Sequence, residues 1–361
     1  MSTAQRPPAG IQRGRGAVGN PAGRFEVRTL DPFDDGWGSG EPLQDAPVTE
    51  VREEFARTIL SKNTSPDIPF DVSLNAYRGC EHGCIYCFAR PTHSYLDLSP
   101  GLDFETKLFA KPNAAELLRS ALRKRRYKPT PIALGTNTDP YQPIERRYAL
   151  TRKILEVLEE FRHPATIVTK SALVLRDIDL LQSMARAGRV HVYLSVTTLD
   201  RSLARTMEPR AGTPERRMEA LAELGRAGIP CGVLAAPMIP ALNDHELENI
   251  LTAARDNGVG QAAYILLRLP HEVAPLFEEW LHAHYPAKAA HVLSLMRQMR
   301  GGQLYRAEWG RRMRGTGPFA ELLRRRFETT CRRLKLNRER PKLDCDAFRV
   351  PAQRGDQTQL F

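Results

Sequence analysis

The chain has 361 residues, of which 42% are apolar, and this is enough to bury the core of one barrel-sized domain with extensions. A formal net charge of +11 favours an anionic partner. Three of the six cysteines are clustered, which excludes a disulfide framework. Because no apolar run suits a membrane span or an export signal, we expect a cytoplasmic protein without membrane contact.

Residues 1–48 are rich in proline, glycine, arginine and aspartate and show no sustained periodicity. This composition predicts a disordered or loosely attached segment. Within it, the alternation at residues 24–28 predicts a short docked strand. Residues 49–70 are expected to form a helix and a linker, with the helix over residues 50–60 and Thr49 as its N-cap.

From residue 70 onward, short apolar segments alternate with amphipathic ones. The predicted strands cover residues 70–77, 131–134, 165–169, 190–196, 229–238 and 262–267. The predicted helices cover residues 114–125, 151–161, 178–187, 214–227 and 244–257. Asn113 is expected to cap the first of these helices, and Gly228 to end the fourth. The alternation predicts an α/β fold whose parallel strands are joined by right-handed crossovers.

Three cysteines, Cys80, Cys84 and Cys87, follow the first predicted strand with the spacing C-x3-C-x2-C. Gly83 lets the backbone turn between them. Three thiolates are one fewer than the usual four ligands of an iron–sulfur cluster, and they leave one iron open to another ligand. The alternative is a structural zinc site, which is closed by four protein ligands and needs His93 as the fourth.

Polar clusters stand where the predicted strands end. They occupy the cysteine loop and residues 136–139, 169–171, 195–198 and 237–244. The carboxyl ends of parallel strands are where α/β folds carry their chemistry. A structural zinc site does not require such a sheet behind it. The placement therefore favours a catalytic cluster.

A C-x3-C-x2-C loop after the first of six strand–helix units resembles the radical S-adenosylmethionine enzymes, over residues 71–270. The resemblance implies a partial (β/α)6 TIM-like barrel in which Cys80, Cys84 and Cys87 hold a [4Fe–4S] cluster. In that family S-adenosyl-L-methionine chelates the fourth iron, and its one-electron cleavage gives a 5′-deoxyadenosyl radical that abstracts hydrogen from the substrate. An electron donor such as flavodoxin or ferredoxin is implied as a partner.

The resemblance also implies cofactor-binding positions. Tyr86 stands at the position that contacts adenine, and Ser195 is placed to reach the ribose. Lys170 and Arg268 are candidates for pairing with the carboxylate. The methionine amino group is bound by the segment after the second strand, here with threonines and an aspartate where Gly-Gly-Glu is common. The candidate residues of this segment are Gly135, Thr136, Thr138 and Asp139.

Residues 77–84 and 138–143 resemble the spore photoproduct lyase-like branch, which contains DNA-repair-type lyases and many bacterial relatives. Lyases of this branch that split the thymine dimer use a further cysteine as hydrogen donor, just after the second strand. Here the matching residues 135–139 include no cysteine. The resemblance therefore implies the branch and not the dimer-splitting reaction itself.

Residues 271–345 are expected to form a basic helical region, followed by a flexible tail at residues 346–361. Helices are predicted at residues 276–280, 291–299 and 318–334, the last with solvated arginines and with inward-facing Leu322, Leu323, Phe327 and Leu334. Residues 306–342 contain thirteen Lys or Arg and four Glu, with Trp309, Phe319 and Phe327 among them. Basic residues interleaved with aromatic ones suit a phosphate backbone and an unstacked base, so DNA or RNA is the expected partner of this stretch.

Two alternatives stay open. One is the same radical chemistry acting on a protein or a small molecule. The other is a non-enzymatic, zinc-dependent nucleic-acid-binding protein that uses the three cysteines and His93. Of the remaining candidates, His82 is interpreted as a surface loop histidine rather than a hydrogen-bond donor to a cluster sulfur. Free thiols are expected at Cys231, Cys331 and Cys345.

Overall fold

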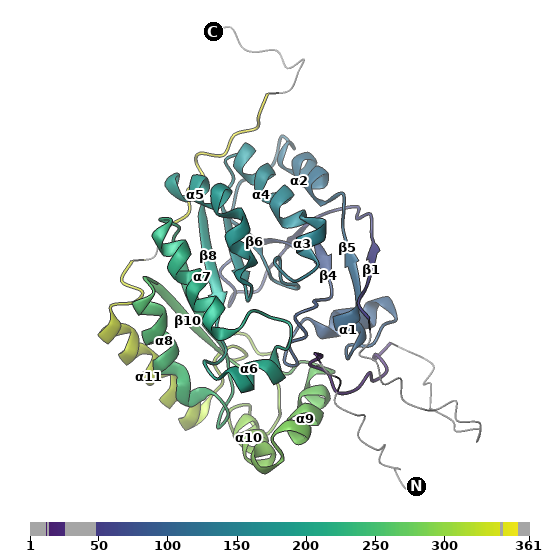
Figure 1. Ribbon diagram of the computed structural model, residues 1–361, viewed down its shortest axis with the longest axis vertical. Coiled ribbons are helices and arrows are strands. Elements are labelled where there is room, and N and C mark those ends of the chain that lie inside the picture. Colours follow the sequence, from purple (N-terminus) through teal and green to yellow (C-terminus); the bar gives the residue numbers. More distant parts are fainter. Residues whose placement is uncertain (1–11, 13, 26–47, 340–341, 353–361) are drawn as a thin grey trace, which may run out of the picture.

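The computed structural model describes residues 12, 14–25, 48–339 and 342–352. The strands of its main sheet are β2 Leu60–Lys62, β3 Val72–Leu74, β6 Ile132–Leu134, β7 Ala165–Thr169, β8 Val190–Ser195, β9 Cys231–Met238 and β10 Gln261–Leu266. They form a seven-stranded sheet in the order β10-β9-β8-β7-β6-β3-β2 (Figure 1). All neighbouring pairs are parallel except β2 with β3. The fold is thus the predicted α/β fold with a mainly parallel sheet, consistent with a partial (β/α)6 TIM-like barrel.

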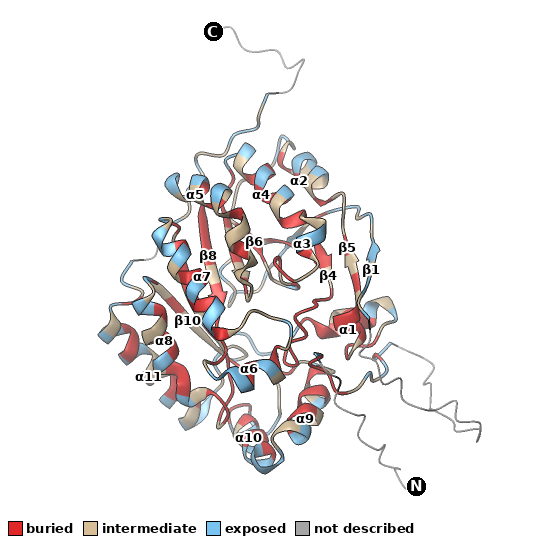
Figure 2. Cartoon of the chain, viewed as in Figure 1, coloured by how far each residue is buried: buried red, intermediate tan, exposed pale blue. Residues whose placement is uncertain are grey.

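Helices connect the parallel strands and cover the outside of the sheet (Figure 1). They are α2 Ala114–Leu122, α3 Glu145–Tyr148, α4 Leu150–Glu160, α5 Ile178–Arg186, α6 Arg201–Met207, α7 Pro214–Arg226 and α8 Leu247–Asp256, with 3-10 helices η2 Ala172–Asp177 and η3 Asp244–Glu246. Their buried sides face the sheet, as the colours of Figure 2 show and as fully buried Leu155 and Leu158 of α4 illustrate. The five predicted helices correspond to α2, α4, α5, α7 and η3 with α8, with differences at their ends, whereas α3, α6 and η2 were not predicted.

One predicted helix end is confirmed and one helix cap is wrong. Gly228 follows α7 with a φ of +72°, as expected for a residue that ends a helix. Asn113 precedes α2 without a side-chain cap. Its amide group instead exchanges two hydrogen bonds with the backbone of Ala56, at 3.2 and 2.9 Å. The side chain thus ties two distant segments together, a role that local sequence does not reveal.

A second sheet contains the segment that was expected to be a helix. Its order is β1-β5-β4, with β1 Glu50–Glu53, β4 Tyr77–Arg78 and β5 Lys107–Ala110. Because β1 pairs in parallel with β5 and β2 begins at Leu60, the predicted helix over residues 50–60 is wrong. Val51, Phe55 and Ile59 recur every four residues, as in a helix, but Phe55 is 73% exposed and the backbone of residues 50–53 pairs with β5 instead. Thr49, the predicted cap, donates its hydroxyl hydrogen to Glu81 at 2.9 Å.

Residues 14–25 pack against the body of the protein and are not loosely attached. Ala17 and Val18 are buried, and the amide of Asn20 donates to Asp103 at 3.1 Å. This segment meets the 3-10 helix η1 Arg90–Leu96 and the short helix α1 Asp103–Thr106. Composition misled here because small residues suit close packing as well as disorder. The strand predicted at residues 24–28 falls mostly outside the described residues, and its first two residues form a turn.

Three helices follow the last strand: α9 Val273–His284, α10 Pro286–Gln298 and α11 Gly317–Leu334. On α11, Leu323 is buried and Phe327 packs against the core. Leu322 is 54% exposed, so its predicted inward orientation is wrong. Neighbouring residues of a helix point about 100° apart, and Leu323 takes the inward place. Among the described residues, none of the helices has the length and apolar character needed to span a membrane.

Candidate functional site

The cysteine loop, residues 79–88, follows β4, and hydrogen bonds from its backbone N–H groups hold it in place. Gly79 and Gly83 have φ values of +73° and +66°, which glycine adopts without strain. The N–H of Cys80 donates to Phe104 at 3.0 Å, and that of Cys87 donates to Cys84 at 3.1 Å. Cys80 and Cys84 are buried and Cys87 is half-buried. The loop therefore gathers three sheltered thiols.

These thiols suit an iron–sulfur cluster better than a single zinc ion. Burial raises the pKa of Cys80 and of Cys84, so a strongly bound positive centre is needed to hold them as thiolates. Among the described residues, no three His, Cys, Asp or Glu side chains gather around one metal position. In a [4Fe–4S] cluster each cysteine binds a different iron, so the ligands need not meet at one point. The donor set therefore fits the cluster.

His93, the candidate fourth zinc ligand, serves the packing of η1 against β5. The residue is fully buried, and its Nε2 atom lies 2.9 Å from the carbonyl oxygen of Lys107. Its ring packs edge-on against Phe104, with 5.1 Å between the ring centres. Burial lowers the pKa of this imidazole. The Nε2 atom is thus engaged with the backbone of β5, whereas the buried Nδ1 atom has no hydrogen-bond partner. Among the described residues, His93 and the cysteines do not meet around one metal position.

Tyr86 is fixed by a buried network next to the cysteine loop. Its hydroxyl donates to Glu208, which also forms a buried ion pair with Arg217. The hydroxyl of Thr197 donates to Glu208 at 2.6 Å. Burial raises the pKa of Glu208, and the charge of Arg217 opposes this. The ammonium of Lys170 lies 5.7 Å from the centre of the Tyr86 ring, so two of the candidate cofactor residues meet here.

Asp139 joins the loop after β6 to the end of β7 and to the cysteine loop. Its carboxylate accepts from the hydroxyl of Thr169 at 2.6 Å and from the N–H of Lys170 at 2.8 Å. The Nδ1 atom of His82 lies 3.3 Å from it. Burial raises the pKa of Asp139, but His82 and the hydrogen bonds outweigh it and lower the pKa to about 2. His82 is only 2% exposed, so its interpretation as a surface histidine is wrong.

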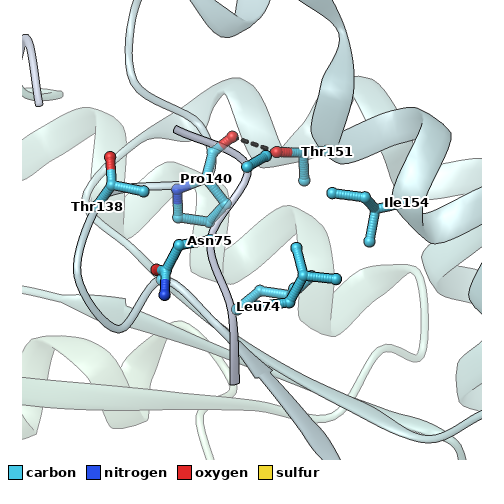
Figure 3. Close-up of a pocket in the computed structure, with 9 residues that line it drawn as sticks. Leu74, Asn75, Thr138, Pro140, Thr151 and Ile154 are labelled. Carbon is cyan, nitrogen blue, oxygen red and sulfur yellow. Dashed lines mark hydrogen bonds between the residues drawn. The ribbon is translucent and has the colours of Figure 1, made fainter. Parts of the chain in front are cut away.

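The threonines of residues 135–138 tie the loop after β6 to residues between β3 and the cysteine loop. The hydroxyl of Thr136 accepts from Asn75 at 2.9 Å, and that of Thr138 donates to Gly79 at 2.6 Å. Gly135 has a φ of +88°, and a β-carbon there would lie 2.0 Å from the backbone of β7. The space enclosed between this loop, β3 and α4 measures about 10 Å³, roughly one water molecule (Figure 3). The two hydroxyls are therefore engaged with Asn75 and Gly79, before and at the start of the cysteine loop.

The last two candidates are Ser195, the final residue of β8, and Arg268, which follows the end of β10. Ser195 is buried, and its carbonyl oxygen accepts from Arg217 at 3.0 Å. The guanidinium of Arg268 lies 4.5 Å from the centre of the Phe88 ring, which is 44% exposed. Burial lowers the pKa of Arg268. Lys170 thus stands beside Tyr86, whereas Arg268 stands beside Phe88, the residue after the third cysteine.

Sequence reasoning missed the groups that support the site. Arg90 and Glu105 are fully buried beneath the cysteine loop, and Arg90 donates to the carbonyl oxygen of Cys84 at 2.9 Å. Glu208 and Arg217 form the second buried pair. Each stands alone in its segment and belongs to no motif. In the sequence, the one sign of such a group is a charged residue inside a segment that is expected to pack against the core.

The model of the Radical SAM superfamily matches residues 74–254, half of the chain. The chain belongs to this superfamily. It is therefore a radical S-adenosylmethionine enzyme, and the family implies a [4Fe–4S] cluster and S-adenosyl-L-methionine as its cofactors.

Relatives of similar sequence occur in bacteria and archaea. An uncharacterized protein of Mycobacterium tuberculosis is 38% identical over 249 residues, which cover 68% of this chain and 73% of that protein. An uncharacterized protein of Methanocaldococcus jannaschii is 31% identical over 173 residues, 48% of this chain and 62% of that protein. These names add no activity to that of the superfamily.

Solved structures of spore photoproduct lyase have a similar fold. The lyase complexed with dinucleoside spore photoproduct matches with a TM-score of 0.56 and 15% identity, covering 79% of each chain. A mutant lyase with bound AdoMet and the same dinucleoside matches with a TM-score of 0.56 and 16% identity, again over 79% of each chain. At this identity the likeness shows a shared fold.

Proposed function

We propose that Cys80, Cys84 and Cys87 bind three irons of the [4Fe–4S] cluster, and that the strand ends bind S-adenosylmethionine at its open iron. The observation that carries this proposal is the gathering of three sheltered thiols in one loop, next to the buried polar groups of the strand ends. When bound, the cluster and the cofactor supply a carbon radical for hydrogen abstraction. An external one-electron donor of the flavodoxin or ferredoxin type completes the system.

The chain's own residues orient the cofactor. The ring of Tyr86, held through Glu208, faces the adenine, and Ser195 meets the ribose. Lys170 or Arg268 pairs with the carboxylate. Because their hydroxyls are engaged with Asn75 and Gly79, Thr136 and Thr138 offer backbone groups to the amino group, together with Gly135 and Asp139. Among them Tyr86, Thr138 and Ser195 are buried, which limits the access of water to the reacting centre.

The test is anaerobic reconstitution with iron and sulfide, followed by reduction with dithionite in the presence of S-adenosylmethionine. The wild type is expected to bind about four irons per chain and to release 5′-deoxyadenosine, and Cys84→Ala to fall below about one hundredth of that yield. Cys231→Ala is the matched control. Cys231 is also buried, but it is the first residue of β9 and so lies at the amino end of the parallel sheet. Full activity of Cys84→Ala, or equal loss in the control, would contradict the assignment.

We also propose that the substrate is a nucleic acid, DNA or RNA, bound by the basic C-terminal region. This region has two basic parts. Residues 301–316 have four Arg and one Glu, and α11 has five Arg and two Glu, so each carries +3. The first part, which we call the 301–316 loop, lies at the carboxyl end of β10, where Leu266 donates its N–H to the carbonyl oxygen of Met313 at 3.0 Å. The residues after α11 lie at the opposite end, where Asn337 donates to Gly260 at 2.9 Å.

Both parts contain paired arginines, and they differ in their aromatic neighbours. In the loop, Arg311 pairs with Glu308 and Arg312 with Asp67, at 3.2 and 2.7 Å. Arg324 pairs with Glu321 on α11, and Arg326 pairs with Glu248 on α8, at 2.7 and 2.6 Å. In the loop, Trp309 is 61% exposed among exposed arginines. An aromatic ring beside guanidinium groups suits an unstacked base and its phosphate.

Arg268 extends this surface to the cysteine loop. Burial is the main cause that lowers the pKa of Arg268, and the nearby groups that also act on it include Tyr305 and Arg312 of the 301–316 loop and Cys87. Its guanidinium covers the half-exposed ring of Phe88. A nucleotide held on the 301–316 loop therefore lies within reach of the cysteine loop. Dimer splitting is not part of the proposal, since residues 135–139 offer no thiol as hydrogen donor.

The substrate class is tested by oligonucleotide binding at several salt concentrations. Neutralising Arg311 and Arg314 as glutamines is expected to weaken binding about tenfold and to reduce the salt slope by about 2. The control neutralises Arg332 and Arg333, which are equally exposed at the other end of the sheet. Equal weakening by both pairs would indicate unspecific attraction. No weakening by the loop pair would favour a protein or small-molecule substrate.

A further inference from the structure

The N-terminal strap, which we define as residues 14–25, lies on the outside of the cysteine loop. In Figure 1 it is the dark purple segment near α1 and α9. The N–H groups of Gly16 and Ala17 donate to the two carboxylate oxygens of Glu105, at 2.9 and 2.8 Å. Ala17 and Val18 are buried. The strap is thus bound to the protein through its backbone at one buried carboxylate.

Glu105 in turn holds Arg90, and Arg90 holds the cysteine loop. The two side chains are fully buried, with the Nη2 of Arg90 2.5 Å from Glu105. The guanidinium donates to the carbonyl oxygens of Cys84 at 2.9 Å and of Gly83 at 3.2 Å. A buried ion pair is stable only when its remaining hydrogen-bonding groups are satisfied. The strap supplies two donors that complete this pair.

The strap also touches the cysteine loop directly. A β-carbon at Gly16 would lie 1.7 Å from the carbonyl oxygen of Gly83, the residue before the second cysteine. At a second place, a β-carbon at Gly101 would lie 2.4 Å from the carbonyl oxygen of Gly19 in the strap. Neither contact leaves room for any side chain. The strap therefore fits in one position, with its backbone against the backbone of the loop.

We propose that the N-terminal strap completes the cluster-binding loop, with Arg90 and Glu105 as positioning residues for Cys84. The strap's N–H groups fix Glu105, Glu105 fixes Arg90, and Arg90 fixes the carbonyl oxygens of Gly83 and Cys84, which set the course of the loop at the second cysteine. Displacing the strap loosens this loop and opens Cys84 to solvent. The inference rests on the proposed function in one respect, that the three cysteines hold the cluster.

The test compares Gly16→Ala and Gly101→Ala, which push on the strap at two separate places, with Gly260→Ala. A β-carbon at Gly260 meets no atom within 4 Å, so this variant is the matched control. The first measurement needs no cluster: the full-length apo-protein is alkylated with iodoacetamide, and the rate at Cys84 is followed by mass spectrometry. Both strap variants are expected to react about tenfold faster at Cys84. Cys231, buried and far from the strap in sequence, serves as the internal reference for unfolding.

The second measurement is iron content after anaerobic reconstitution and desalting. The strap variants are expected to retain about half the iron of the wild type or less, and the control to retain all of it. Wild-type rates at Cys84 and wild-type iron in both strap variants would overturn the inference. If Cys231 also becomes reactive in Gly16→Ala, that variant has unfolded. The alkylation rate at Cys84 and the iron content of Gly101→Ala then decide the question. A wild type that takes up no iron, with Cys84 still exposed faster in the variants, would reject the proposed function and support the strap.

Discussion

The two ends of the parallel sheet hold the same kinds of charged pair in different surroundings. At the carboxyl end, Glu208 and Arg217 form an ion pair whose side chains are 0% and 1% exposed. At the amino end, Arg189 is 6% exposed and lies 2.6 Å from Glu159, which is 25% exposed. Glu208 also accepts from Tyr86, whereas Glu159 accepts from a surface serine. Only the first pair is linked to the cysteine loop.

This difference teaches that a charged pair gains a functional role from what surrounds it. A buried carboxylate must be satisfied on every side, so its neighbours are held in one geometry. A pair in contact with water can be replaced by hydration at little cost. The carboxyl end is therefore rigid where a cofactor needs fixed partners. The amino end tolerates change.

The largest expected effect is the loss of the buried carboxylate. Glu208→Gln leaves Arg217 charged and buried without an anion, and should lower the free energy of unfolding by about 3–5 kcal/mol. Glu159→Gln, at the pair whose carboxylate is partly exposed, should lower it by less, about 1–2 kcal/mol, because Arg189 is buried but water reaches the side chain at position 159. Urea unfolding followed by circular dichroism measures both. Equal losses would break the comparison between the two ends.

The next effect is a dependence on pH at the amino end, due to His163. Its Nδ1–H donates to Pro164 at 2.9 Å, so its Nε2 accepts the hydroxyl of Tyr127 at 2.7 Å. Burial lowers the pKa of His163 from 6.5 to about 4. The unfolded chain binds the proton more tightly, so the stabilisation is complete above pH 6.5 and is lost as the pH falls toward 4.

Unfolding at about pH 7 and about pH 5 should therefore differ by about 2 kcal/mol through His163 alone. The measurement is the difference between the wild type and His163→Gln, because other buried histidines titrate in both proteins. An unchanged pH slope in the variant would show that the imidazole titrates alike in the folded and unfolded chains. Asp139 at the carboxyl end, with a pKa of about 2, should keep its charge throughout this range.

Features that depend on residues close together in the sequence could be predicted, and those that depend on residues far apart in the sequence could not. The strand at residues 165–169 and the three cysteines are local patterns, and both could be recognised without a structure. The bond between Gly16 and Glu105 joins residues 89 positions apart, and no local pattern indicates it. The same holds for β1, which became a strand because β5 offers it a backbone partner. The supporting groups of the site belong to this second kind.

The smallest effect sharpens the comparison between buried and exposed positions within one residue type. Leu322 and Leu323 are neighbours on α11, and the sequence predicted both to face inward. Leu323 is 1% exposed and Leu322 is 54% exposed. Leu323→Ala should lower the free energy of unfolding by about 2–5 kcal/mol, because it leaves a cavity. Leu322→Ala should change it by less than about 0.5 kcal/mol, since alanine also favours the helix. Thermal and urea unfolding of the two variants give this contrast. Equal destabilisation would mean that α11 lies on α8 in a different rotation, with its arginines redistributed between partners and solvent.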